Sequence, residues 1–152
     1  MSSQRPSDRG SPRRHDDVLG YLLKHAHMAL EARTDAALAP LRVTARDMGA
    51  LRVIAAGEAR SQQEVAAVLG VDRTSMVALL DALEREGIVA RRPFEQDRRR
   101  NVIELTEAGR KVFTEAEQTA LAVEDEFVES LGADGANELR AALQSLLAET
   151  AQ

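Results

Sequence analysis

The stretch Ser61–Gly87 reads SQQEVAAVLGVDRTSMVALLDALEREG, and it decides how the chain folds. Ser61 followed three residues later by Glu64 is a capping-box pattern, which marks the start of a helix. Gly70 is placed to stop that helix in a left-handed conformation. Asp72 then caps a second helix that ends at the last glycine of the stretch. The pattern therefore predicts two helices joined by a three-residue turn.

Both helices carry apolar residues at helical spacing. The expected buried face of the first consists of Val65, Val68 and Leu69. The expected buried face of the second consists of Met76, Leu79, Leu80 and Leu83. Ala66 is small where two crossing helices need a close approach. This pattern is similar to the bacterial helix-turn-helix, whose second helix lies in the DNA major groove, and an ordinary helical hairpin is the alternative.

Length and composition limit the remaining choices. The 152 residues are 44% hydrophobic but only 3% aromatic, so a single domain, with or without an oligomerising part, is expected to have an aliphatic core. The sequence has no cysteine, which excludes disulfides, thiol redox sensing and cysteine-rich zinc sites. It shows no apolar run long enough for a membrane helix and no signal peptide. We therefore expect a cytoplasmic protein with no membrane contact.

The charge is unevenly distributed along the chain. A net charge of −5 and a pI near 5.3 argue on their own against nucleic acid as a partner. However, basic residues are concentrated in 91–100 and acidic ones in 115–129. A DNA-binding end and an acidic end far from DNA would produce this asymmetry.

Two further helices are expected before the central stretch. Residues 1–14 are rich in Ser, Pro, Gly and Arg and are expected to form a disordered basic tail. A long helix is predicted over 15–39, because its apolar residues recur over much of its surface and Pro40 ends it. A second is predicted over 44–56, capped by Thr44, with Met48, Leu51, Ile54 and Ala55 as its buried face.

A β-hairpin is expected directly after the helix pair. Ile88–Arg92 and Asn101–Leu105 are predicted strands on either side of PFEQDRRR, a turn-prone and strongly basic loop. This order is typical of a wing that reaches beside a recognition helix. A solvated loop is the alternative, but a phosphate or minor-groove role for the arginines fits their position in the chain better.

Two amphipathic helices close the chain. Thr106 is predicted to cap a helix that runs to about Ser130, Gly132–Gly135 to break it, and Asp134 to cap a last helix reaching about Thr150. Together with the helix over 15–39, these exceed what a small core can cover, which predicts a symmetric homodimer. The expected fold is mainly α with a small β-hairpin wing: a winged helix-turn-helix plus long N- and C-terminal dimerisation helices.

Two segments, DRTSMVALLDALEREGIVARR and DRRRNVIELTEAG, resemble the MarR family of bacterial transcription regulators. The resemblance extends from about residue 16 to about residue 150. It implies a homodimeric winged helix-turn-helix repressor, released from a pseudo-palindromic operator by a small, often aromatic or phenolic, ligand. It also implies a DNA-binding domain over 40–105 and dimerisation helices over 15–39 and 106–152.

The resemblance assigns candidate DNA contacts by position. In the wing they are Asp97, Arg98, Arg99 and Arg100, with Arg99 entering the minor groove and Asp97 holding the tip in shape. In the recognition helix they are Arg73, Thr74, Ser75, Val77 and Ala78. Candidate phosphate contacts at the start of the preceding helix are Ser61, Gln62 and Gln63.

The recognition helix departs from the family pattern at two positions. Val77 and Ala78 stand where many relatives have Thr and Arg, and these apolar side chains can contact only thymine methyl groups. Sequence preference is therefore expected to come more from the other contacts, the wing and DNA shape. On the same helix, Asp81 and Arg85 are four residues apart, a spacing at which they can pair.

Other functional classes find little support in the sequence. No Ser/His/Asp set, metal cluster or phosphate-binding glycine loop can be assembled, so we expect neither an enzyme nor a cofactor. His25 and His27 lie on different faces of a helix and cannot share a metal. Residues that could wall a ligand pocket are Tyr21, His25, Met48 and Arg52, although core or surface roles suit each of them. A DNA-binding protein without a ligand, or a protein–protein adaptor, are the alternatives.

Overall fold

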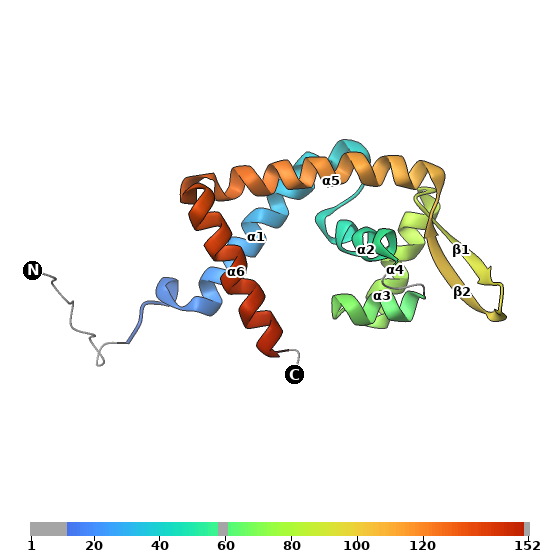
Figure 1. Cartoon of the computed structure of the whole chain (residues 1–152), viewed down its shortest axis with the longest axis horizontal. Helices are drawn as coiled ribbons and strands as arrows, with labels where there is room; N and C mark the ends of the chain where they lie inside the picture. Colours follow the sequence, from blue (N-terminus) through green and yellow to red (C-terminus); the bar gives the residue numbers. More distant parts are fainter. Residues whose placement is uncertain (1–11, 58–60, 151–152) are drawn as a thin grey trace, which may run out of the picture.

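A computed structural model describes residues 12–57 and 61–150, a mainly helical chain with one β-hairpin (Figure 1). The elements, in chain order, are α1 (Leu19–Leu38), α2 (Ala45–Ala56), α3 (Gln62–Leu69), α4 (Arg73–Arg85), β1 (Val89–Phe94), β2 (Asp97–Leu105), α5 (Glu107–Val128) and α6 (Gly132–Thr150). This confirms the predicted fold class. Within these ranges no helix is both long and apolar enough to cross a membrane.

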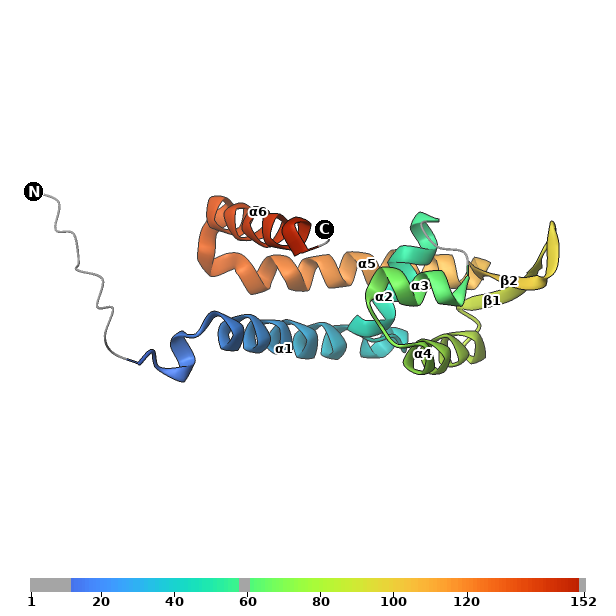
Figure 2. The ribbon, with the colours of Figure 1, turned by 90° about the horizontal axis from the view of Figure 1, so that it is seen from below.

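The elements form a lobe and an arm. Helices α2, α3 and α4 and the hairpin make the lobe, and α1 and α5 run side by side away from it (Figures 1 and 2). Helix α6 turns back at the far end of α5. The arm therefore projects well beyond the lobe, with one end of α5 joined to the wing and the other end joined to α6.

The core of the lobe is aliphatic, as expected. The largest fully buried side chains are Leu38, Met48, Leu51, Val65, Met76, Leu80 and Val89. All four predicted core residues of α4 are buried, which confirms that prediction. Two details of the buried faces were wrong. Val68 is 53% exposed, because α3 packs through Val65 and Ala66, and Ala55 is exposed where Ala50 and Val53 are buried instead.

Helix caps account for where the lobe helices begin and end. Ser61 and Glu64 form a reciprocal capping box, with N–H to oxygen distances of 3.2 and 2.9 Å. Gly70 ends α3 in the left-handed region at φ 63°. The Ser75 N–H donates to Asp72 Oδ1 at 2.8 Å, and hydrogen bonds from Ser75 lower the pKa of the Asp72 carboxyl. The predicted helix pair is confirmed.

The long helices differ from prediction at their ends. Helix α1 begins only at Leu19, because Val18 is extended and separates it from a 3-10 turn over His15–Asp17. The break before α6 is a 3-10 turn over Glu129–Leu131. Asp134 therefore lies in the first turn of α6 instead of capping it. Most of the predicted tail, residues 1–11, lies outside the described residues.

The wing is longer than predicted. Strands β1 and β2 pair antiparallel from Val89 opposite Leu105 to Phe94 opposite Asp97, with an irregularity next to Pro93. Only Glu95 and Gln96 form the turn. The predicted basic loop was therefore wrong in extent, since 97–100 belong to β2. Backbone pairing along the hairpin holds this polar segment extended although its side chains are exposed.

The start of α5 is fixed against the base of the wing. The Thr106 hydroxyl donates to Gly87 O at 2.5 Å, and its oxygen accepts the Gly109 N–H at 2.8 Å. Gly109 packs so closely on the chain that a Cβ there would lie 1.9 Å from Ile88 O. The Leu-Thr-Glu-x-Gly segment therefore has a physical role, which is to hold the arm onto the lobe.

Replacing Gly109 by Ala tests this close approach. We expect Gly109→Ala to lower the free energy of unfolding by about 1–3 kcal/mol, because the methyl group must displace backbone. Gly49→Ala is the matched control in α2, since its Cβ would make an ordinary contact 3.6 Å from Leu69. Urea denaturation of both variants measures the difference, and equal stabilities would contradict the packing at Gly109.

Candidate nucleic-acid interface

The outward face of α4 presents most of the predicted contact residues. Arg73, Thr74 and Ala78 are exposed, whereas Ser75 and Val77 are half-buried. Asp72 fixes the first turn of the helix by capping it. The start of α4 is exposed, and the small side chain of Ala78 does not project far from the helix. The helix backbone can therefore approach a DNA groove closely, as a base-reading helix requires.

A concave surface joins this helix to the other predicted contacts. A cleft of about 310 Å³ lies between the starts of α3 and α4 and the wing. We call it the DNA cleft, and it is lined by Ser61, Gln62, Gln63, Arg73, Arg91, Arg99, Arg100, Asn101 and Ile103. Six of these nine residues are predicted contacts that are far apart in the sequence. Four are arginines, which makes the cleft locally positive in a chain of net charge −5.

The wing side of the DNA cleft is held by short polar contacts. The Asp97 carboxylate accepts the backbone N–H of Arg99 at 3.1 Å, so it shapes the strand and leaves the guanidinium free to point outward. Arg98, Arg99 and Arg100 are all exposed. The Arg100 guanidinium lies 3.8 Å from the Glu64 carboxylate, which brings the wing close to the start of α3.

Arg91 lines the DNA cleft and was missed in the sequence. Its guanidinium pairs with Glu84 and, at 2.6 Å, with Asp81, both on α4. Asp81 therefore does not pair with Arg85, whose Nε instead donates to the Asp81 backbone oxygen at 3.3 Å. Burial lowers the pKa of Arg91, but the hydrogen bonds to Asp81 and Glu84 outweigh this effect, so the pKa is raised. The guanidinium remains charged.

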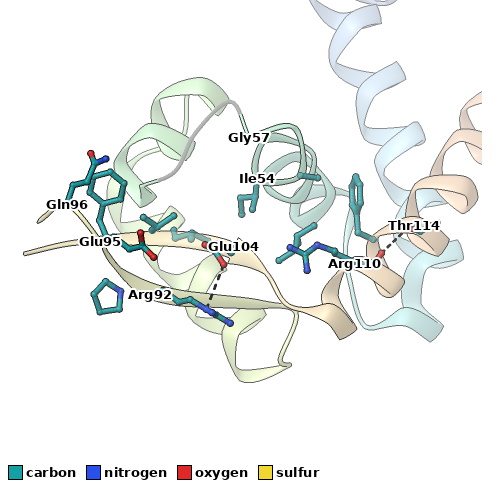
Figure 3. A pocket seen from close by; sticks show the side chains of 15 residues that line it. Ile54, Gly57, Arg92, Glu95, Gln96, Glu104, Arg110 and Thr114 are labelled. Atoms are coloured by element: carbon teal, nitrogen blue, oxygen red, sulfur yellow. Dashed lines mark hydrogen bonds and ion pairs between the residues drawn. The ribbon is translucent and has the colours of Figure 1, made fainter. Parts of the chain in front are cut away.

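The opposite face of the wing borders a second, larger groove. Figure 3 shows this groove, of about 840 Å³, with Ile54, Arg92, Glu104 and Arg110 around it. Arg92 Nε lies 3.7 Å from Glu104 Oε2. Because its rim carries both signs of charge and no predicted DNA contact, it lacks the single-sign potential of the DNA cleft.

A third cavity lies between the lobe and the arm. It measures about 580 Å³ and is walled by α1, α2, α4 and α5, together with the end of α3 and the turn after it. Met48 and Arg52, two of the four predicted pocket residues, line it. Tyr21 and His25 lie outside it, exposed near the start of α1, with ring centroids 3.9 Å apart. On α1 the lining of the cavity begins at His27, two residues after His25.

Two ion pairs border this lobe–arm cavity. Arg52 Nε donates to Glu117 Oε2 at 2.8 Å and so joins the lobe to α5. Arg140 of α6 donates to Glu124 at 2.7 Å, and this contact raises the pKa of Arg140. Among the described residues, no group of three or more His, Cys, Asp or Glu could hold a metal ion.

Comparison with known proteins connects this architecture to one family. The family model named MarR family matches residues 43–100. A protein named as a transcriptional regulator for the hcr operon of Thauera aromatica is 33% identical over 79 residues, which are 52% of this chain and 48% of that protein. The chain thus spans about half the length of this curated relative.

Solved structures match over most of their length. CouR, a transcriptional repressor of Rhodococcus jostii RHA1, in its complex with a 23-mer DNA duplex, is 32% identical, with a TM-score of 0.77 over 94% of this chain and 100% of CouR. MarR of E. coli in its apo form is 27% identical, with a TM-score of 0.74 over 86% of this chain and 97% of MarR.

These proteins are transcription regulators, which agrees with the expectation that the chain is not an enzyme. The likeness to CouR covers the arm as well as the lobe. On these similarities, and on its winged helix-turn-helix, the chain belongs to the MarR family of transcriptional regulators.

Proposed function

We propose that the protein is a homodimeric repressor that binds a pseudo-palindromic DNA operator through the DNA cleft. The observation that carries this proposal is the convergence of α3, α4 and the wing on one arginine-rich surface. In this arrangement α4 enters the major groove, and Arg99 reaches the adjacent minor groove. This chain resembles CouR over the whole length of CouR, and CouR has been solved bound to a DNA duplex. Operator binding would place the protein in the cytoplasm.

The contacts in the DNA cleft suit phosphate and base recognition. Gln62 Oε1 faces the Arg91 guanidinium at 3.4 Å, so the amide NH₂ of Gln62 is left to donate to a phosphate. The Ser61 hydroxyl, which accepts one bond in its capping box, can still donate another. Ala78 offers a methyl contact to thymine, while Arg73 and Thr74 supply donors at the exposed start of α4.

The proposed dimer follows from uncovered apolar surface on the arm. Exposed large apolar residues there are Val18, Leu19, Tyr21, Leu22, Leu23, Met28, Leu121, Leu131, Leu139, Leu146 and Leu147. A second copy would cover them. Residues 15–39 and 106–152 then form the dimerisation part and 40–105 the DNA-binding domain. Two α4 helices would meet half-sites about 10 base pairs apart.

We further propose that an acidic aromatic compound binds in the lobe–arm cavity and releases DNA. The cavity combines apolar side chains such as Met48 and Leu30 with the cations Arg46 and Arg52. The carboxylates Glu31 and Glu124 also line it, and Glu124 is paired with Arg140. A carboxylate that pairs with Arg52 would compete with Glu117 for the contact that joins lobe and arm. The related CouR has been solved with p-coumaroyl-CoA bound. The ligand must favour the DNA-free arrangement, or affinity for DNA will not change.

Arg99→Ala tests the role of the wing. We expect this change to weaken binding by about 1–3 kcal/mol, the scale of one good contact in a groove. Duplexes selected from a random-sequence pool by the wild-type protein serve as probes, and fluorescence anisotropy gives the affinities. Arg110→Ala is the matched control, because it removes the same charge from an exposed position outside the DNA cleft. Equal losses in the two variants would contradict a specific role for the wing.

Arg52→Gln tests the ligand. With p-coumaroyl-CoA and its parent phenolic acid as probes, we expect increasing concentrations to release the selected duplex from the wild type. Because p-coumaroyl-CoA is a thioester without a free carboxylate, the response to the free acid is the one that should be reduced in Arg52→Gln, where the ligand carboxylate loses its partner. Both responses should be kept in Arg92→Gln, since Arg92 lies outside the cavity. No response of the wild type to either probe would contradict this ligand class while leaving DNA binding in place.

A further inference from the structure

The side chains of β1 alternate between the interior of the lobe and the groove of Figure 3. Val89 is buried and Arg91 follows it on the same face, opposite buried Ile103. Arg92 points to the other face, beside Glu104. As a result the Arg91 side chain is 20% exposed and that of Arg92 is 70% exposed. Two consecutive arginines of one strand thus have different environments.

Arg91 connects all three walls of the DNA cleft. It belongs to the wing, its guanidinium pairs with Asp81 and Glu84 on α4, and Nη2 lies 3.4 Å from Gln62 Oε1 on α3. Its backbone N–H also donates to Glu84 Oε1 at 3.2 Å. By comparison, the ion pairs of Arg92 and Arg100 are single contacts at 3.7 and 3.8 Å. A planar guanidinium that binds several partners fixes the positions of those partners relative to one another, whereas a single long contact does not.

The placement of these contacts matters for reading DNA. The wing and α4 must reach adjacent grooves of one duplex at the same time, and a small change in the angle between them would misalign one of the two. We propose that Arg91 is a positioning residue, whose forked pairing with Asp81 and Glu84 sets the angle between α4 and the wing and thereby the discrimination between DNA sequences. This inference rests on the proposed DNA-binding function.

Paired substitutions of the neighbouring arginines test the proposal. The probes are a duplex selected by the wild type and a scrambled duplex of the same length and composition. We expect Arg91→Met to lower affinity for the selected duplex about tenfold or more, the effect of losing a coupled charge network. Arg92→Met, which removes the same charge from the outer face, should change it little. The scrambled duplex reports how much of each loss comes from charge alone, so the ratio of the two affinities measures discrimination; it should fall in Arg91→Met and be kept in Arg92→Met.

A second pair of variants separates position from charge. Arg91→Lys keeps the charge but cannot form the fork, so we expect partial loss of discrimination. In Arg91→Met combined with Asp81→Asn and Glu84→Gln, no carboxylate is left to repel phosphate, yet the angle remains unfixed and discrimination should stay low. Full recovery in this triple variant, or wild-type discrimination in Arg91→Lys, would overturn the positioning role.

The controls distinguish failure of the proposed DNA-binding function from failure of the role of Arg91. Urea denaturation establishes that each variant is folded under assay conditions. If Arg91→Met is not folded, Arg91→Lys is compared with the wild type in its place. If the wild type binds both duplexes equally, the proposed function fails. If the wild type discriminates and Arg91→Met discriminates equally well, only the role of Arg91 fails.

Discussion

One face of the wing packs onto the helices of the lobe, and this packing fixes the position of the wing relative to α4. Val89, Ile103 and Leu105 join the same buried cluster as Leu80 and Leu83 of α4. Burying three such side chains contributes about 1.5–3 kcal/mol each relative to exposure. Since strand residues alternate in direction, this packing decides which wing residues face the DNA cleft. It also makes the recognition helix and the wing parts of one body.

The electrostatics of the protein follow from this placement. The chain is acidic overall, yet the DNA cleft gathers four arginines from α4 and both strands. The acidic residues of 115–129 lie on α5 and, for Glu129, on the 3-10 turn that follows it, and α5 leads away from the lobe along the arm (Figure 1). DNA phosphates would repel the negative arm and attract the positive cleft, so the protein would approach DNA with its lobe in front. Net charge alone is therefore a poor guide to the partner of this chain.

The sequence predicted features that depend on local chemistry and missed those that depend on tertiary partners. The caps at Ser61 and Asp72 and the apolar spacing of α4 each depend on residues only a few positions apart. The helix pair was therefore predicted correctly. The ion-pair partner of Asp81 was not predicted correctly, because Arg91 of β1 pairs with Asp81 in place of Arg85. Because successive strand residues point to opposite faces, the buried Val89 could have indicated that Arg91, two residues later, faces the lobe. No local pattern could place Tyr21 and His25 outside the lobe–arm cavity, since that depends on where α1 meets α2.

In the proposed complex, a dimer reads DNA with two α4 helices and two wings held at a fixed angle. Hydroxyl-radical footprinting of the wild-type protein on a duplex selected from a random pool would reveal this arrangement. We expect two symmetric protected regions about 10 base pairs apart, each flanked by minor-groove protection where the wing reaches. Selection that yields no preferred sequence, or a single protected region without symmetry, would contradict this arrangement.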